Sequence, residues 1–178
     1  MLDFDPSFPY HICDFAWKLM EKGAFKIDKS MNDDVLVTYH DPCNVARAAG
    51  FFEPPRKMTR YMANHFYEMH PDTIRERTYC CGGGGGVLAD ELTDLRTLGG
   101  RARAEAIKNL GKKLAREHNG DVRKWTPNYL CTPCAICKAS LPDSMSRWNV
   151  LSDWRGEEES EVCVVGGVHD LMLKSIIF

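Results

Sequence analysis

Cysteine is the residue type in this chain best suited to chemistry, and its positions are clustered. Cys80 and Cys81 are adjacent, and a second group recurs at every third position within 131–137. Neighbouring cysteines rarely form a disulfide with each other, because the ring that they would close is strained. Thiolates drawn from distant segments are instead typical ligands of iron–sulfur clusters. The pattern therefore predicts a cluster or another redox site, to which Cys43 would contribute from a position 37 residues before Cys80.

Five consecutive glycines follow the cysteine pair directly. Glycine carries no Cβ and adopts positive φ readily, so the backbone can pass close to a bulky cluster and point its N–H groups at the sulfides. Burial of free cysteine is common, but packing alone does not explain two cysteines next to five glycines. We expect Gly82, Gly83 and Gly84 to contact the cofactor.

Titratable and charged side chains lie close to these cysteines in the sequence. His40 lies three residues before Cys43, where it is a candidate to donate to a cluster sulfur or to shuttle a proton to a departing thiolate. Capping of a following helix is the alternative role for His40, and Asp41 is an equally suitable cap. Three arginines are candidates either to stabilise an anionic cluster or to lie on solvated faces, namely Arg47, Arg56 and Arg75.

The order of one cysteine, a Cys-Cys-Gly motif and a Cys-x-x-Cys motif resembles the cysteine-rich CCG domain of heterodisulfide reductases and their relatives. The flanking sequence is most similar to the carboxy-terminal part of DsrK, the heterodisulfide-reductase-like subunit of the sulfite-reductase-associated complex. The similar segments extend over nearly the whole chain and are 39–44, 52–56, 65–69, 73–76, 80–82, 99–102 and 167–171. Two features depart from the family pattern. The gap after Cys81 is longer by more than ten residues, which indicates an insertion near 111–127, and three cysteines stand where two are needed.

This resemblance implies a single CCG-type cysteine-rich domain over residues 1–178, as a fragment of a longer iron–sulfur protein. It also implies a [4Fe-4S] cluster, in cubane or noncubane form, that delivers electrons to a disulfide in anaerobic sulfur or energy metabolism. Cys81 is the expected catalytic residue. The expected metal ligands are Cys43, Cys80, Cys81, Cys134 and Cys137, with Cys131 as a substitute.

The same resemblance implies a protein substrate and an assembly. The expected substrate is the carboxy-terminal disulfide of a DsrC-like sulfur carrier, and the expected partners are the other subunits of a membrane-associated redox complex. The chain has 23 basic and 25 acidic residues, and a net charge of −2 argues against nucleic acid or an anionic membrane surface as the main partner. We find no apolar run long enough for a membrane span and no signal-peptide pattern in the acidic amino terminus. The expected location is therefore cytoplasmic, peripheral to a membrane complex.

Other chemistries remain open at these residues. Zinc is the main competitor, because 131–137 has the Cys-x-x-Cys spacing of a zinc knuckle, and the rival function is a zinc-stabilised interaction module without a redox role. Thiolate sites also capture zinc adventitiously. Cys131 and Cys134 match a thioredoxin-type motif, which would leave the other clustered cysteines without a role. The glycine run matches a loose dinucleotide fingerprint, but five consecutive glycines make that match nearly automatic. Cys13 and Cys163 have the surroundings of core residues.

The elements that must position these residues alternate between strand and helix patterns. This alternation predicts an α/β fold, with a parallel sheet flanked by helices and the cysteines at the carboxyl ends of the strands, where ligands bind in such sheets. The predicted strands are 35–39, 73–79, 128–131 and 162–165. The predicted helices are 11–22, 42–50, 56–69, 87–118 with a break at 99–100, 134–140 and 168–177, with a turn at 53–55.

Overall fold

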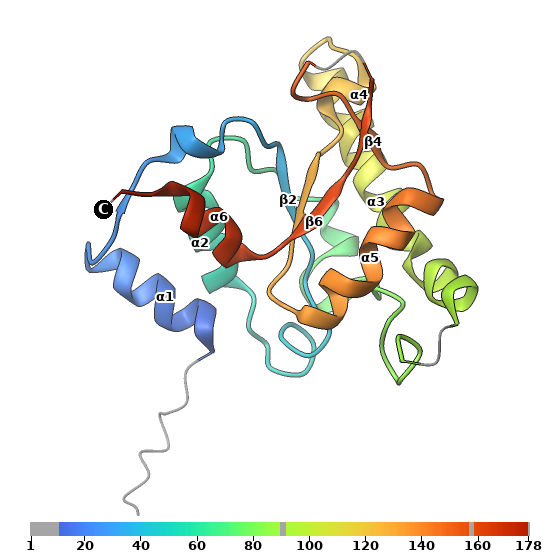
Figure 1. Cartoon of the computed structure of the whole chain (residues 1–178), viewed down its shortest axis with the longest axis horizontal. Coiled ribbons are helices and arrows are strands. Elements are labelled where there is room, and N and C mark those ends of the chain that lie inside the picture. Colours follow the sequence, from blue (N-terminus) through green and yellow to red (C-terminus); the bar gives the residue numbers. More distant parts are fainter. Residues whose placement is uncertain (1–10, 90–91, 157–158, 178) are drawn as a thin grey trace, which may run out of the picture.

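A computed structural model describes residues 11–89, 92–156 and 159–177 of the chain. Its centre is a parallel sheet of three short strands in the order β2-β3-β6, and helices cover both faces of this sheet (Figure 1). The three strands are β2 (Val37–Tyr39), β3 (Tyr129–Cys131) and β6 (Val164–Gly166). The predicted α/β class, with a parallel sheet flanked by helices, is therefore confirmed.

The three strands of the central sheet are aligned, and their side chains alternate between its two faces. Val37 pairs with Tyr129, and Tyr129 pairs in turn with Val164, so the strands are aligned at their first residues. Successive side chains point to opposite faces of a strand. Leu130 accordingly enters one hydrophobic core, while Cys131 enters the other.

Two cores flank the sheet, one on each face. The first lies between the sheet and the helices α3 (Thr93–Glu117) and α5 (Ala135–Arg147). The second lies between the sheet and the helices α1 (Ile12–Glu21), α2 (Glu53–Met62) and α6 (Val168–Ser175). Figure 1 separates the two groups of helices on either side of the strands. Short buried strands of a parallel sheet have apolar neighbours on both faces, which explains their nearly continuous apolar sequence.

The remaining strands of the described part of the chain form two small sheets of their own. β1 (Lys26–Ile27) pairs with β7 (Ile176–Ile177), and β4 (Leu151–Ser152) pairs with β5 (Glu161–Val162), both antiparallel. The short helix α4 (Val122–Trp125) and the end of α3 fill the segment that the sequence indicated as an insertion. None of the helices in the described part of the chain is both long enough and apolar enough to cross a membrane.

The segment 73–79 is not a strand, so that prediction is wrong. It lies in two short 3-10 helices, Pro71–Thr73 and Arg75–Arg77. Arg75 has a φ of 54°, which an extended strand does not allow, and its backbone N–H donates to the Asp41 carboxylate at 2.8 Å. Cys80 therefore follows a turn instead of a strand.

Two boundary predictions around α2 are also wrong. Glu53 and the two prolines after it form the first turn of the helix, where proline is tolerated, and not a separate turn. The helix ends at Met62 because the chain then runs along the edge of β2, where the Val37 N–H donates to the His65 carbonyl at 2.7 Å.

The predicted helix over 42–50 is also wrong. This segment is a series of turns in which the Ala46 N–H donates to the Pro42 carbonyl at 2.8 Å.

The predicted strand 162–165 is divided between two sheets. Its first residues belong to β5 and its last to β6, and the buried Cys163 lies between them. Neither Gly99 nor Gly100 breaks α3, contrary to the expectation, because the helix is continuous through both.

These two glycines allow a close contact with the cysteine segment. Gly82 has a φ of +86°, and a Cβ at this position would lie 2.0 Å from the Arg96 carbonyl oxygen. A Cβ on Gly99 would lie 2.9 Å from the Gly82 Cα, and one on Gly100 would lie 2.1 Å from Ser144 Oγ. The absence of side chains thus lets α3, α5 and the backbone after Cys81 pack directly against one another.

We predict that Gly100→Ala destabilises the fold, because the new methyl group would overlap the Ser144 side chain. Overpacking of this kind costs about 1–3 kcal/mol. Urea denaturation measures the change in the free energy of unfolding. Gly84→Ala is the matched control, since a Cβ there meets nothing within 4 Å, and it should change stability by less than about 0.5 kcal/mol. Equal stability of the two variants would contradict the packing described above.

Candidate functional site

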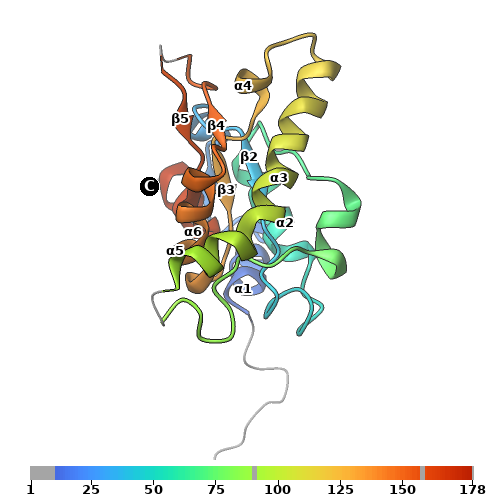
Figure 2. The same cartoon turned by 90° about the vertical axis from the view of Figure 1, so that its right-hand side faces the viewer.

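The candidate site lies at the carboxyl end of the central sheet. The segment that follows β2, the glycine-rich segment and the start of α5 all lie at this lower end of the molecule in both views (Figures 1 and 2). Cys43, the Cys80-Cys81 pair and the cysteines before and within α5 belong to these three segments. Two of these segments follow a strand, and the segment of Cys80 does not.

Cys81 is the buried member of its pair, and two contacts hold it. Ser140 Oγ on α5 donates to the Cys81 carbonyl at 2.9 Å, which fixes the backbone. The Gly83 N–H points at the Cys81 sulfur at 3.4 Å, and the Gly82 N–H points at the sulfur of the exposed Cys80 at 3.2 Å. Gly82 and Gly83 therefore direct backbone donors at cysteine sulfurs, and their contact with a cofactor stays a prediction.

The side chain of Cys137 interacts with Cys81 and also with Cys134. The pKa of Cys81 is lowered to about 4, first by the interaction with Cys137 and then by the His40 ring and the Gly83 N–H, and burial opposes this shift. The pKa of Cys137 is raised far above its ordinary range, first by the interaction with Cys81 and then by burial. The two shifts have opposite directions, so the interaction favours a single negative charge on the pair, at Cys81.

His40 is buried beside this pair. Its backbone N–H donates to the Cys131 carbonyl at 2.9 Å, which extends the pairing of β2 with β3. Burial lowers the pKa of His40 to about 4, and contact with the Cys81 sulfur only partly offsets this effect. The ring is therefore neutral at pH 7. The contact is not a fully aligned hydrogen bond, because neither ring nitrogen has a partner within the described residues.

The other predicted ligands are not gathered around the same point. Cys43 and Cys80 are exposed, and Cys134 is half-buried. Among the residues that the structure describes, no three His, Cys, Asp or Glu side chains are arranged so that they could hold one metal ion. We call Cys81, Cys137 and the half-buried Cys134 the sulfur row, because Cys137 interacts with both of the others, and the exposed Cys43 and Cys80 lie in the adjoining loops.

The remaining cysteines lie apart from this row. Cys131 is fully buried on the opposite face of the sheet, in the core that contains Cys13, and burial raises the pKa of its thiol well above the ordinary range. Cys163 is also buried, and burial raises the pKa of its thiol to about 12. Gly84 is exposed, and a Cβ at this position would meet nothing within 4 Å.

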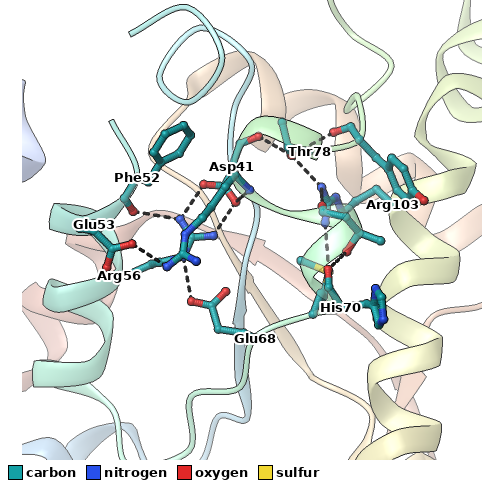
Figure 3. Close-up of polar contacts among 12 residues, drawn as sticks. Asp41, Phe52, Glu53, Arg56, Glu68, His70, Thr78 and Arg103 are labelled. Atoms are coloured by element: carbon teal, nitrogen blue, oxygen red, sulfur yellow. Dashed lines mark hydrogen bonds and ion pairs between the residues drawn. The ribbon is translucent and has the colours of Figure 1, made fainter. Parts of the chain in front are cut away.

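An ion pair that the sequence did not single out fixes the loops around the site. Asp41 and Arg56 are both fully buried, and the Arg56 guanidinium donates to the two carboxylate oxygens at 2.6 and 2.7 Å (Figure 3). Arg56 also donates to Glu68 at 2.8 Å. Burial opposes the charge of Arg56, but these two carboxylates raise its pKa above the ordinary value. A solvated-face role for Arg56 and a helix-capping role for Asp41 are both wrong.

Asp41 also connects the segment after β2 to the segment before Cys80. Its carboxylate accepts from the Arg75 backbone N–H at 2.8 Å, and its carbonyl accepts from Thr78 Oγ1 at 2.8 Å. Arg47 adds a further link, because its Nε donates to the Glu76 carbonyl at 3.1 Å. The loop that carries Cys43 is thereby joined to the loop that carries Cys80.

Comparison with known proteins agrees with the cysteine pattern. The model of a family described as CCG, cysteine-rich domain, matches residues 37–142. The Hdr-like menaquinol oxidoreductase iron-sulfur subunit 2 of Archaeoglobus fulgidus is 45% identical over 140 residues, which are 79% of this chain and 23% of that protein. One of the subunits of the dihydromethanophenazine:CoB–CoM heterodisulfide reductase of Methanosarcina acetivorans is 37% identical over 134 residues, 75% of this chain and 28% of that protein.

A more distant relative is named for a different activity. One of the subunits of the fumarate reductase (CoM/CoB) of Methanothermobacter marburgensis is 31% identical over 115 residues, 64% of this chain and 19% of that protein. The chain thus spans about a quarter of the first two relatives' length and about a fifth of this one. No solved structure matches the chain significantly.

We predict that Asp41→Asn strongly destabilises the protein, because it removes the bidentate partner of a fully buried guanidinium. Removing one member of a buried ion pair costs about 3–5 kcal/mol. The free energy of unfolding in urea measures the effect. Asp72→Asn is the matched control, since it breaks an exposed pair with Arg77 and should cost less than about 1 kcal/mol. Similar decreases in the free energy of unfolding of both variants would show that the buried pair stabilises the fold no more than the exposed pair.

We further predict a thiolate at Cys81 in the reduced, cluster-free protein near neutral pH. The folded pKa of about 4 lies below the ordinary thiol value of about 8.5, so the stabilisation from this group grows as the pH rises through that window and is lost as the pH falls toward 4. Ultraviolet thiolate absorbance, followed from neutral to acidic pH, measures it. Cys81→Ser should remove the signal, and Cys163→Ser should leave it unchanged. A signal that persists in the Cys81 variant would refute the assignment.

Proposed function

The chain belongs to the CCG cysteine-rich domain family, and from this premise we propose that it is an iron–sulfur electron-transfer domain of a heterodisulfide-reductase-like complex. The proposal includes the arrangement of the relatives, in which such a domain is one part of a longer subunit. The observation that carries it is the position of Cys81, whose carbonyl is bound by Ser140 on the helix of Cys137 and whose sulfur faces the Gly83 N–H, beside a Cys80 sulfur that faces the Gly82 N–H. The lowered pKa of Cys81 agrees with a thiolate ligand.

The donor set of this chain suits an iron–sulfur cluster in its chemistry. Cluster irons are held by deprotonated cysteine sulfurs, and Cys81 already has this form in the folded protein. Backbone N–H groups directed at cluster sulfurs tune the reduction potential, and the N–H groups of Gly82 and Gly83 are directed at cysteine sulfurs here. A multi-iron cluster takes its thiolates on different irons, so its ligands need not surround one point as they do for zinc.

We assign the ligand role to the cysteines of the three segments at the carboxyl end of the sheet: Cys43, Cys80, Cys81, Cys134 and Cys137. The buried position of Cys131 on the opposite face of the sheet argues against the substitute role considered from the sequence. A bound [4Fe-4S] cluster, cubane or noncubane, would supply one-electron transfer at this site.

The chain's own residues have separate tasks in this proposal. Reduction of a disulfide to two thiols consumes two electrons and two protons, and Cys81, at the buried end of the pair, is the residue that the substrate sulfur would approach. His40 is neutral at pH 7, so one ring nitrogen carries a hydrogen and can donate it to a sulfur, while the other can accept. The low pKa makes the ring a poor proton store, which favours a donor role over a proton shuttle.

The substrate and partners are the finer parts of the proposal. One relative's name specifies a CoB–CoM heterodisulfide and another specifies menaquinol, so the relatives share disulfide or quinol redox chemistry. We propose a disulfide as the electron acceptor, with the carboxy-terminal disulfide of a DsrC-like carrier as the specific candidate suggested by the DsrK-like segments. The remaining subunits of a membrane complex are the proposed partners, with this domain peripheral to the membrane.

We predict that anaerobic reconstitution with iron and sulfide gives the full chain a visible iron–sulfur absorption band and an EPR signal after oxidation or reduction. Cys81→Ser and Cys137→Ser should lose most of the bound iron, because they remove adjacent members of the sulfur row. Cys131→Ser is the matched control and should retain the cluster.

Three results would count against this function. Bound zinc in place of iron after native anaerobic purification would support the zinc-stabilised module. Full iron content in Cys81→Ser, together with unimpaired disulfide reduction, would remove the catalytic role of this residue. Loss of the cluster in the Cys131 variant would overturn the ligand assignment.

A further inference from the structure

Arg103 is a fully buried guanidinium near the sulfur row. It extends from α3 and has no solvent exposure. Its Nη2 donates to the Thr73 carbonyl and to Thr78 Oγ1, both at 2.8 Å, and its Nη1 donates to the Met69 sulfur at 3.0 Å. Figure 3 shows this group across Thr78 from the Asp41 carboxylate.

The partners of Arg103 are all neutral. Within the described part of the chain no carboxylate forms an ion pair with it, and its Nε has no hydrogen-bond partner. Asp41 is the acidic group that interacts with Arg103 across a distance, but its carboxylate is already bound by both terminal nitrogens of Arg56 and by the Arg75 N–H. The Tyr79 ring, with its centroid 5.7 Å from the guanidinium carbon, offers only a weak cation–π contact.

A buried charge without a counter-charge destabilises the folded state, because it loses its hydration and gains no Coulombic attraction in exchange. Burial lowers the pKa of Arg103 to about 10, which still leaves the group protonated at neutral pH. The fold therefore retains a positive charge that its own carboxylates do not neutralise by contact. A compensating negative charge is expected nearby.

In the proposed function, negative charge would lie on the cysteine segments, because a cluster held by thiolates is anionic. Arg103 interacts electrostatically with Cys137 and with His40, the two side chains that also interact with Cys81. Its acceptor Thr78 lies two residues before Cys80. One turn earlier on α3, Gly99 and Gly100 pack against the backbone of residues 81 and 82. Helix α3 thus supports the cysteine segment and carries the unpaired cation at the same time.

We propose that Arg103 is the internal counter-charge of the thiolate-bound cluster and raises its reduction potential. This inference rests on the proposed function. A cluster held by thiolates is anionic, and reduction adds one more negative charge in a poorly hydrated environment. A fixed cation in a medium of low dielectric stabilises the more negative, reduced state more than the oxidised one. Arg103 acts through this field and through the segments that it binds, so it is a positioning residue and not a catalytic one.

The competing explanation is purely structural. Arg103 also joins the Thr73 carbonyl, Thr78 and Met69, so it could serve only to hold the 69–78 segment against α3. The two explanations assign importance to different properties of the Arg103 side chain. The electrostatic role depends on the charge, whereas the structural role depends on the pattern of hydrogen bonds.

The test measures the midpoint potential of the reconstituted full chain by spectroscopic redox titration. Arg103→Met and Arg103→Gln remove the charge, and Arg103→Lys keeps it with fewer hydrogen bonds. Arg101→Met is the matched control, because it removes an exposed arginine from the same helix. We expect both neutral variants to lower the ratio of reduced to oxidised cluster at the wild-type midpoint by about tenfold, which is about 59 mV for one electron. Arg103→Lys and Arg101→Met should change that ratio by less than about twofold, on the same scale.

The possible outcomes distinguish a failure of the proposed function from a failure of the role assigned to Arg103. If the wild-type chain binds no cluster, the proposed function fails. If it binds one and the neutral variants keep the wild-type potential, only the role of Arg103 is overturned. A shift of equal size in Arg103→Lys would also overturn it, in favour of the structural explanation. If neither neutral variant folds, Arg103→Lys alone decides, since an unchanged potential supports the charge and a negative shift contradicts it.

Discussion

The buried ion pair between Asp41 and Arg56 is the constraint on which the candidate site depends. Removing either group would leave the other charge buried without the partner that offsets its lost hydration. Together they fix the residue that follows His40 to helix α2, and the same carboxylate fixes the turn at Arg75. Through Thr78 the connection continues to Arg103 on α3. The loops with Cys43 and Cys80 are thus positioned by one continuous set of polar contacts.

The sulfur row is positioned by helix α5. α5 brings Cys137 to Cys81 and supplies Ser140, which binds the Cys81 carbonyl. Two thiols in one buried place cannot both ionise easily, so one proton remains between them. The result is a site with a definite charge before any metal binds. This asymmetry distinguishes Cys81 from the buried cysteines 13, 131 and 163, whose thiols stay protonated.

The sequence was sufficient for those parts of the structure that local pattern determines. Apolar runs predicted the strands that became β2 and β3, which pair in parallel. It was insufficient where a contact between distant residues decides the conformation. Arg75 has positive φ because its N–H binds Asp41, so 73–79 could not be extended. Arg103 carries no local signal, since a helical arginine is ordinarily solvated and only the assembled fold makes it buried.

The close contact between Gly82 and the turn of α3 at Gly99 has a consequence for the rate of electron exchange. Backbone that packs directly against a helix cannot shift when the charge of a nearby group changes, whereas Gly84 and the exposed loop after it can. In the proposed role, the ligand at Cys81 would keep nearly the same position in both oxidation states. Little nuclear rearrangement would then accompany each transfer, so the reorganisation energy that limits such reactions would be small.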